Sequence, residues 1–162
     1  MIRGLHHVAV STPDLDRLVG FYTDVLGFEQ IGWTGGWDRG NPLIDEVLAL
    51  KDSAARQAML KAGDLHLEIF EYSSPPPRPG DPDRPVCDHG YTHFCLDVVD
   101  IEAEYERLSA AGMRFHRPPL FDREQGLAAT YGRDPDGNVV EIQEVLKPSH
   151  PMHMRHLPGT AK

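Results

Sequence analysis

The stretch Leu5-His6-His7-Val8-Ala9-Val10 has a counterpart later in the chain, Tyr91-Thr92-His93-Phe94-Cys95-Leu96. Both stretches are short, largely apolar and bounded by turn-forming residues, which predicts β-strands, and the first is expected to be covered on both faces. The residues that recur with an offset of 86 or 85 positions are His7 with His93, Asp14 with Asp100, and Gly27 with Gly112. An internal duplication explains this better than chance does.

Each of these strands is followed by the signature of an amphipathic helix. In the first half, Pro13 suits the first helical position and Asp14 complements the positive end of the helix dipole. Apolar residues then recur at helical spacing up to Leu26, and Gly27 supplies the stop. In the second half, Asp100 is the expected N-cap of an equivalent helix.

Three strand-like runs follow each predicted helix. They are residues 28–32, 56–60 and 65–72 in the first half, and residues 114–117, 127–131 and 139–145 in the second. A hairpin is expected at Asp134-Pro135-Asp136-Gly137-Asn138, where Pro presets φ and Gly tolerates positive φ. Each half is therefore β-α-β-β-β, and we predict an α+β fold in which two tandem βαβββ modules form an open eight-stranded pair of half-barrels.

The limits of the modules follow from composition. Residues 1–74 form the first module and residues 89–146 the second. Between them, residues 75–88 are rich in proline and are expected to form an extended linker. Residues 147–162 contain three prolines without periodicity, which predicts an irregular C-terminal tail.

Bulk composition excludes several classes of function. The formal charge of −9, from 16 basic and 25 acidic residues, argues against a nucleic-acid partner. No window approaches the roughly 18 apolar residues of a membrane span. The two cysteines, Cys87 and Cys95, form no disulfide framework, so we expect reduced thiols and a cytoplasmic protein.

Two histidines and two glutamates occupy corresponding places in the halves. His7 and His93 lie on the first strand of each half, while Glu68 and Glu141 lie in apolar runs on the last. A buried carboxylate needs a counter-charge. Two neutral imidazoles and two carboxylates around a divalent cation balance to zero charge, so we predict a metal site. Mixed nitrogen and oxygen ligands suit Zn, Ni, Co, Mn or Fe without selecting among them.

The alternative for each residue alone is structural. A single histidine on an apolar strand is usually a core residue bonded to a carbonyl, and a single strand glutamate usually lies at an edge. Four such residues at matching positions favour the metal site, with Glu68 the weakest member of the set.

The chain resembles the vicinal oxygen chelate superfamily, which includes glyoxalase I, methylmalonyl-CoA epimerase, bleomycin-resistance proteins and extradiol dioxygenases. The resemblance covers about residues 4–146. The stretches that carry it are His6-His7-Val8-Ala9-Val10, Asp14-Leu15, Phe21-Tyr22, Val25-Leu26-Gly27-Phe28, Thr92-His93-Phe94, and Asp134-Pro135-Asp136-Gly137-Asn138 leading into Val140-Glu141-Ile142.

The resemblance implies a function. The four residues match the ligand pattern of the glyoxalase and epimerase branches, in which Glu or Gln stands at the place of Glu68. It thus implies a divalent-metal-dependent lyase or isomerase that abstracts a proton next to a chelated carbonyl of a small oxygenated substrate, with Glu68 and Glu141 as candidate bases. The alternatives are an Fe(II) extradiol-type ring-cleaving dioxygenase and a metal-free small-molecule binding or resistance protein.

Further residues are candidates for substrate binding. His66 shares a strand face with Glu68, Tyr131 lies in the strand before the hairpin, and Trp33 and Trp37 lie in a glycine-rich loop. Each also has an ordinary structural explanation, such as strand packing or a subunit contact. The tail histidines are expected to be solvated. We expect a small-molecule substrate and a homodimer.

Overall fold

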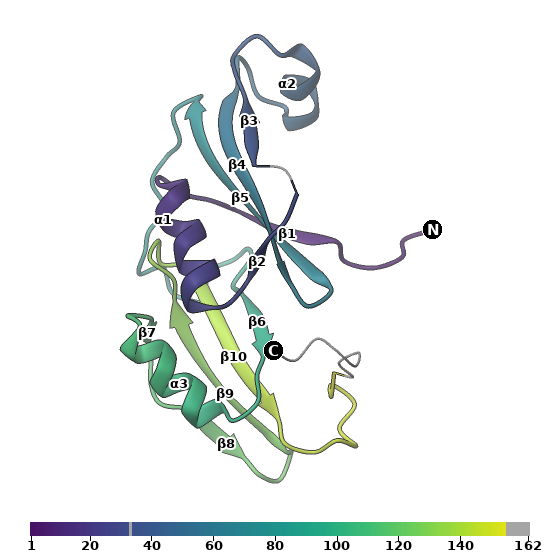
Figure 1. Ribbon diagram of the computed structural model, residues 1–162, viewed down its shortest axis with the longest axis vertical. Helices are drawn as coiled ribbons and strands as arrows, with labels where there is room; N and C mark the ends of the chain where they lie inside the picture. Colours follow the sequence, from purple (N-terminus) through teal and green to yellow (C-terminus); the bar gives the residue numbers. More distant parts are fainter. Residues whose placement is uncertain (33, 155–162) are drawn as a thin grey trace. The chain divides into compact units, whose positions relative to one another are not determined.

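The computed structural model describes residues 1–32 and 34–154, and its chain divides into two compact units, residues 1–80 and 81–162. Each unit contains one five-stranded sheet in its described part, and neither sheet closes into a barrel (Figure 1). The predicted α+β class is confirmed. No helix in residues 1–32 and 34–154 has the length and apolar character needed to cross a membrane.

Unit 1 follows the predicted order with two additions. Its elements are β1 (His7–Ser11), α1 (Leu15–Gly20), η1 (Phe21–Val25), β2 (Glu29–Gln30), β3 (Gly35–Trp37), α2 (Pro42–Leu48), β4 (Ala54–Ala62) and β5 (Leu65–Ser74). The sheet order is β1-β5-β4-β2, and β3 also pairs with β4. The additions are β3 and α2.

Unit 2 repeats this plan. Its elements are β6 (His93–Asp97), α3 (Ile101–Ala110), β7 (Arg114–Phe115), β8 (Leu120–Asp122), β9 (Leu127–Arg133) and β10 (Val139–Val145). The sheet order is β6-β10-β9-β7, and β8 also pairs with β9. The four strands on each main path account for the predicted eight, and β3 and β8 are short fifth strands.

The two faces of each sheet have different roles because side chains alternate along a strand. In unit 1, Leu67 and Ile69 of β5 are buried on the face that packs against α1, whose Leu18 is also buried. Val140 and Ile142 of β10 hold the same places in unit 2. The intervening residues, among them the candidate ligands, therefore lie on the opposite face.

A matched pair of glutamates supports the duplication. The Leu15 amide donates to Glu71 Oε2 at 2.9 Å, and the Ile101 amide donates to Glu144 Oε2 at 3.0 Å. A carboxylate at the N-terminus of a helix satisfies a free amide and complements the helix dipole. Glu71 and Glu144 are 73 positions apart, the same offset that relates Glu68 to Glu141.

The structure differs from the sequence prediction at the first strand. His7 and Ala9 of β1 are exposed, and Val8 and Val10 are only half-buried. The prediction of a strand covered on both faces is therefore wrong: β1 ends its sheet, and none of its residues is buried.

The connecting segments carry no regular structure. No helix or strand lies between Ser74 and His93, and the division between the units falls inside the proline-rich segment. The described part of the tail, residues 147–154, forms turns.

Candidate metal site

In unit 1, His7 and Glu68 come together on one sheet face. Strands β1 and β5 are parallel neighbours, with His7 opposite His66 and Ala9 opposite Glu68. His7 Nε2 lies 3.4 Å from Glu68 Oε2, and the side chains are 41% and 16% exposed. The strand pairing thus creates a His–Glu pair that solvent can reach on the imidazole side.

Unit 2 builds the same pair from equivalent strands. Glu141 of β10 lies opposite Cys95 of β6, and Val139 lies opposite His93. His93 Nε2 lies 3.0 Å from Glu141 Oε2, with the side chains 25% and 14% exposed. The two modules therefore repeat both the residue types and the register that bring them together.

The other ring nitrogen of each histidine is also engaged. His7 Nδ1 lies 2.9 Å from His6 Nδ1, and His93 Nδ1 lies 2.9 Å from Thr92 Oγ1. In both units the partner is the residue just before the histidine. A histidine whose Nδ1–H donates a hydrogen bond presents a free Nε2 lone pair, the form in which imidazole ligates a metal.

The donor distances fit a shared metal ion. Transition-metal bonds to histidine nitrogen and carboxylate oxygen are about 2.0–2.2 Å, so two donors on one ion lie about 3.0 Å apart at right angles and about 3.4 Å apart at the tetrahedral angle. The two pairs have separations of 3.0 and 3.4 Å. Neutral imidazole and carboxylate are donors that Zn, Ni, Co, Mn and Fe accept.

The four candidate ligands form one His–Glu pair in each unit. Among residues 1–32 and 34–154, no group of three or more His, Cys, Asp or Glu side chains that could hold a metal is found.

Tyr131 and Cys95 surround the pair of unit 2. Tyr131 lies opposite Glu141 in the β9–β10 ladder, and its ring centroid is 4.7 Å from that of His93. Desolvation and then the charge of Glu141 raise the pKa of Tyr131. Desolvation, followed by the charge of Glu141, raises the pKa of Cys95 to about 12. Both groups thus keep their protons at neutral pH.

In unit 1 an aromatic cluster lies along the same face. Phe70 and Tyr72 follow Glu68 at alternate positions of β5, and Trp37 contacts both rings at centroid distances of 6.0 and 5.9 Å. The Trp37 indole N–H donates to Ser53 Oγ at 2.9 Å. Desolvation and then the charge of Glu68 raise the pKa of Tyr72. The structure therefore brings Trp37 to the sheet face that carries Glu68.

His66 lies at the opposite end of that face. Its ring stacks on His6 with centroids 5.0 Å apart, and its Nδ1 lies 3.2 Å from the His6 carbonyl oxygen. Trp33, a candidate for substrate binding, and His156 of the tail lie outside the described residues.

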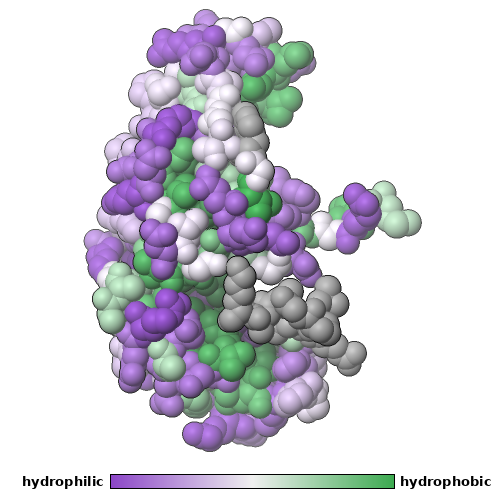
Figure 2. Space-filling model, viewed as in Figure 1, coloured by the Kyte–Doolittle hydropathy of each residue, from purple (hydrophilic) through white to green (hydrophobic). Residues whose placement is uncertain are grey.

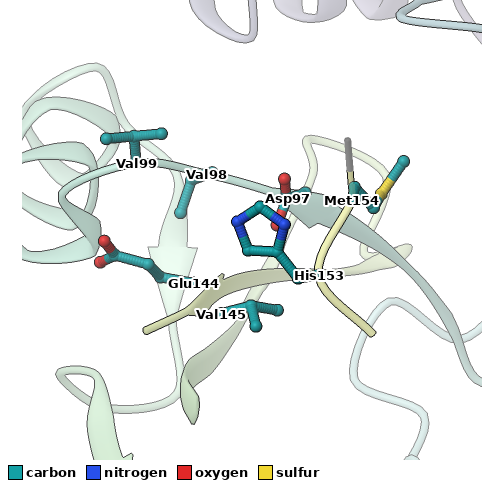
Figure 3. A pocket seen from close by; sticks show the side chains of 7 residues that line it. All are labelled: Asp97, Val98, Val99, Glu144, Val145, His153 and Met154. Atoms are coloured by element: carbon teal, nitrogen blue, oxygen red, sulfur yellow. The ribbon is translucent and has the colours of Figure 1, made fainter. Parts of the chain in front are cut away.

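A small pocket in unit 2 lies away from the candidate ligands. It has a volume of about 80 Å³ and is lined by residues of β6, β10 and the tail, including Asp97, Glu144 and His153 (Figure 3). Pockets that enclose organic ligands are several times larger. We assign no role in substrate binding to it.

The sequence prediction missed four residues that lie around the two His–Glu pairs: His6, Thr92, Phe70 and Tyr72. Phe70 and Tyr72 could have been found by continuing the strand alternation from Glu68. His6 directly precedes His7, and Thr92 directly precedes His93. The sequence has no periodic pattern that predicts a hydrogen bond between adjacent residues.

One known protein family matches most of this chain. A family model described as the glyoxalase/bleomycin resistance protein/dioxygenase superfamily matches residues 4–142. The chain belongs to this superfamily. The resemblance found in the sequence motifs is thereby confirmed, and the superfamily match spans the four candidate ligands.

Enzymes occur among its superfamily relatives. A 2-epi-5-epi-valiolone epimerase from Actinomyces sp is 38% identical over 108 residues, which are 65% of this chain and 57% of the epimerase. A lactoylglutathione lyase from Pseudomonas putida is 24% identical over 155 residues, 85% of this chain and 82% of the lyase. The chain therefore aligns with little more than half of the epimerase and with most of the lyase.

A solved structure supports the fold. A glyoxalase family protein from Bacillus cereus superposes with a TM-score of 0.80 at 20% identity, covering 91% of this chain and 97% of that one. At this identity the likeness shows the fold alone.

Proposed function

We propose that this protein is a divalent-metal-dependent isomerase or lyase that moves a proton at the carbon next to a carbonyl of a small oxygenated substrate. The observation that carries the proposal is the repeated His–Glu pair, with Nε2–Oε2 separations of 3.4 and 3.0 Å. Each pair supplies two of the four ligands of one ion. Four ligands per chain correspond to one ion per chain, whether an ion takes its two pairs from one chain or from two.

Charge balance supports a divalent ion. Glu68 and Glu141 are the less exposed members of their pairs, and no lysine or arginine forms a salt bridge with either within residues 1–32 and 34–154. A largely buried carboxylate needs compensation. Two positive charges from an ion balance two carboxylates between neutral imidazoles.

The chemistry follows from the ligand set. A divalent ion, when bound, polarises a substrate carbonyl and makes the neighbouring C–H bond more acidic. Glu68 and Glu141 are the proposed bases that remove this proton. Returning a proton to the opposite face of the same carbon inverts the configuration of that carbon. Returning it to a neighbouring carbon gives a structural isomer. We assign Glu68 the double role of ligand and base.

Tyr131 has a role that suits its environment. A tyrosine phenol carries its proton at neutral pH and can donate a hydrogen bond. The position of Tyr131 beside His93 and opposite Glu141 favours donation to a substrate oxygen on which negative charge develops.

A lyase or isomerase reaction has more support in this protein than cleavage of an aromatic ring. Glu68 completes a set of four candidate ligands. The ligand pattern of the ring-cleaving branch is instead two histidines and one glutamate. The named relatives include an epimerase and a lyase. A homodimer, a small-molecule substrate and a cytoplasmic location complete the proposal as predictions.

The test is deuterium incorporation from D2O. Metal-loaded protein is incubated with 2-hydroxyacetophenone, 2-epi-5-epi-valiolone or S-lactoylglutathione, and exchange at carbon is followed by NMR. We expect exchange with at least one compound, unchanged in the Glu106→Gln control and slowed at least about 100-fold in Glu68→Gln. Glu106 is an exposed residue of α3.

Two results would contradict the proposal. The first is equal exchange by wild type and Glu68→Gln. The second is no exchange with any of these compounds together with Fe(II)-dependent oxygen uptake on a catechol, which would establish the dioxygenase alternative.

A further inference from the structure

An apolar groove lies on the sheet face of unit 1 that carries Glu68. It runs between α2 and the sheet of unit 1, with a volume of about 410 Å³. Four apolar residues of α2 line one side, and Trp37, Gln57 and Phe70 line the other. This size falls within the range of small-molecule sites. Figure 2 shows apolar side chains gathered at the surface over α2, where Leu43 and Val47 are exposed.

The groove and Glu68 lie on the same sheet face of unit 1. Phe70, which forms part of its wall, is two residues after Glu68 on β5 and therefore lies on the same sheet face, about 7 Å along the strand. Gln57 is the β4 neighbour of Phe70. A molecule whose two oxygens bind an ion held by Glu68 would extend toward Phe70 with its next few carbon atoms.

The lining chemistry restricts what can bind. No lining residue carries a charge, so the groove offers nothing to neutralise a phosphate or a carboxylate. The Trp37 N–H is already taken by Ser53, which leaves the ring surface for contact. The Gln57 amide makes no hydrogen bond to another described residue and is the polar group available to a ligand. The groove therefore suits an uncharged, mainly hydrocarbon group with at most one polar substituent.

From these observations the geometry points to a substrate class: a carbonyl compound with two neighbouring oxygens and an uncharged carbocyclic or aromatic ring, the ring lying in the α2 groove. This inference rests on the proposed function and deepens it. Burying a ring against Phe70, Trp37 and α2 favours such substrates over short-chain ones by the hydrophobic contribution of the ring. A second copy of this chain is the competing occupant, and the position of Phe70 only two residues from Glu68 on the same sheet face favours substrate.

Two chelating probes separate the ring from the metal-binding group. Benzohydroxamate and acetohydroxamate both present two neighbouring oxygens to a metal and differ in carrying a phenyl or a methyl group. Their dissociation constants are measured by calorimetry on cobalt-loaded protein. We expect benzohydroxamate to bind at least about tenfold more tightly, because the groove buries its ring.

Leu43→Glu is the variant that tests the groove. Leu43 is 74% exposed and stands in the first turn of α2, where an acidic residue complements the helix dipole, so the helix is expected to keep its fold. We expect the preference for benzohydroxamate to fall to about twofold or less while acetohydroxamate binds unchanged. Leu120→Glu, at a 59% exposed position of β8, is the matched control and should keep the full preference.

The outcomes distinguish the inference from the proposed function. Failure of acetohydroxamate to bind cobalt-loaded protein would show that the ion has no positions open to two neighbouring oxygens, and would overturn both proposals. Equal affinity for the two probes would overturn the groove inference and leave the metal site standing. A preference that survives Leu43→Glu would place the ring elsewhere and overturn it too. A wild-type dimer that Leu43→Glu dissociates would make the groove a subunit interface, which also overturns it.

Discussion

His93 Nδ1 forms a hydrogen bond with Thr92 Oγ1 at 2.9 Å, while His93 Nε2 lies 3.0 Å from Glu141 Oε2. His7 repeats this relationship with His6 at 2.9 Å and Glu68 at 3.4 Å. With Nδ1 protonated, Thr92 Oγ1 accepts, and His6 accepts through its own Nδ1. Both histidines are thereby held with Nε2 toward the carboxylate.

Thr92 is predicted to be a positioning residue for the metal. Replacing Thr92 by Val keeps the shape of the side chain but removes the acceptor for Nδ1–H, so the ring loses its fixed tautomer and orientation. We expect the affinity for Co²⁺ to fall about tenfold or more, in line with losses of other hydrogen bonds to metal-binding histidines. Metal titration followed by cobalt absorption measures this.

Thr92→Ser provides the control because it restores the hydroxyl without the methyl group. We expect near wild-type affinity in this variant. Equal affinities in Thr92→Val and wild type would show that the hydrogen bond has no part in metal binding.

Gly36 is predicted to hold β3, and with it Trp37, against β4. A Cβ atom added at Gly36 would lie 2.1 Å from the carbonyl oxygen of Ala55, a backbone atom of the neighbouring strand. Because neither strand can yield without losing pairing, Gly36→Ala should lower the free energy of unfolding by about 2 kcal/mol or more. Urea unfolding measures this.

Gly4→Ala is the matched control because nothing lies within 4 Å of its added Cβ. A change below about 0.5 kcal/mol is expected there. A similarly small change in Gly36→Ala would mean that β3 is not closely paired.

Asp45 is predicted to make the stability of unit 1 depend on pH. Its carboxylate accepts from the Ser53 hydroxyl and from the amides of Ser53 and Asp52, and these hydrogen bonds lower its pKa below the ordinary 3.8. Since the pKa is lower in the folded protein, the stabilisation is fully present above 3.8 and is lost as the pH falls through the folded value.

The Asp45→Asn variant checks the sign of this effect. The urea midpoint of wild type should exceed that of the variant at pH 6, and the difference should shrink once the pH falls below about 4. Asp64→Asn, in the exposed β4–β5 turn, should show no such closing gap. A difference between the urea midpoints of wild type and Asp45→Asn that widens as the pH falls would refute the lowered pKa of Asp45.

Much of the fold could be predicted from local patterns. The helix over Ile101–Ala110 begins after its predicted Asp100 N-cap, and β10 spans the predicted residues 139–145. Both elements combine a strong terminal signal with a clear apolar period. The short strands β3 and β8 were not predicted, because three residues carry too little periodicity.

The helix α2 was not predicted although the sequence contains its start signal. Asn41 caps it by accepting from the Ile44 amide, and Pro42 stands at its first turn. The helix has seven residues and none of them is buried, so it lacks the core-facing stripe by which an amphipathic helix is recognised. The groove could not be foreseen for the same reason.

The candidate ligands could be chosen from the sequence because the duplication places them at matching positions. Their side-chain geometry could not, because it depends on the parallel register that puts Ala9 beside Glu68 and Cys95 beside Glu141. Register is a property of strand pairing across about 60 residues in unit 1, and a single strand does not encode it.

Elemental analysis of the purified and dialysed protein, with His7→Ala and Glu141→Ala measured alongside, tests the central claim most directly. The account predicts about one transition-metal ion per chain in wild type and in the Glu106→Gln control, and its loss in both ligand variants. No metal in wild type, even after reconstitution with Zn²⁺, Ni²⁺, Co²⁺, Mn²⁺ and Fe²⁺, would contradict the account and leave a metal-free binding protein as the better description.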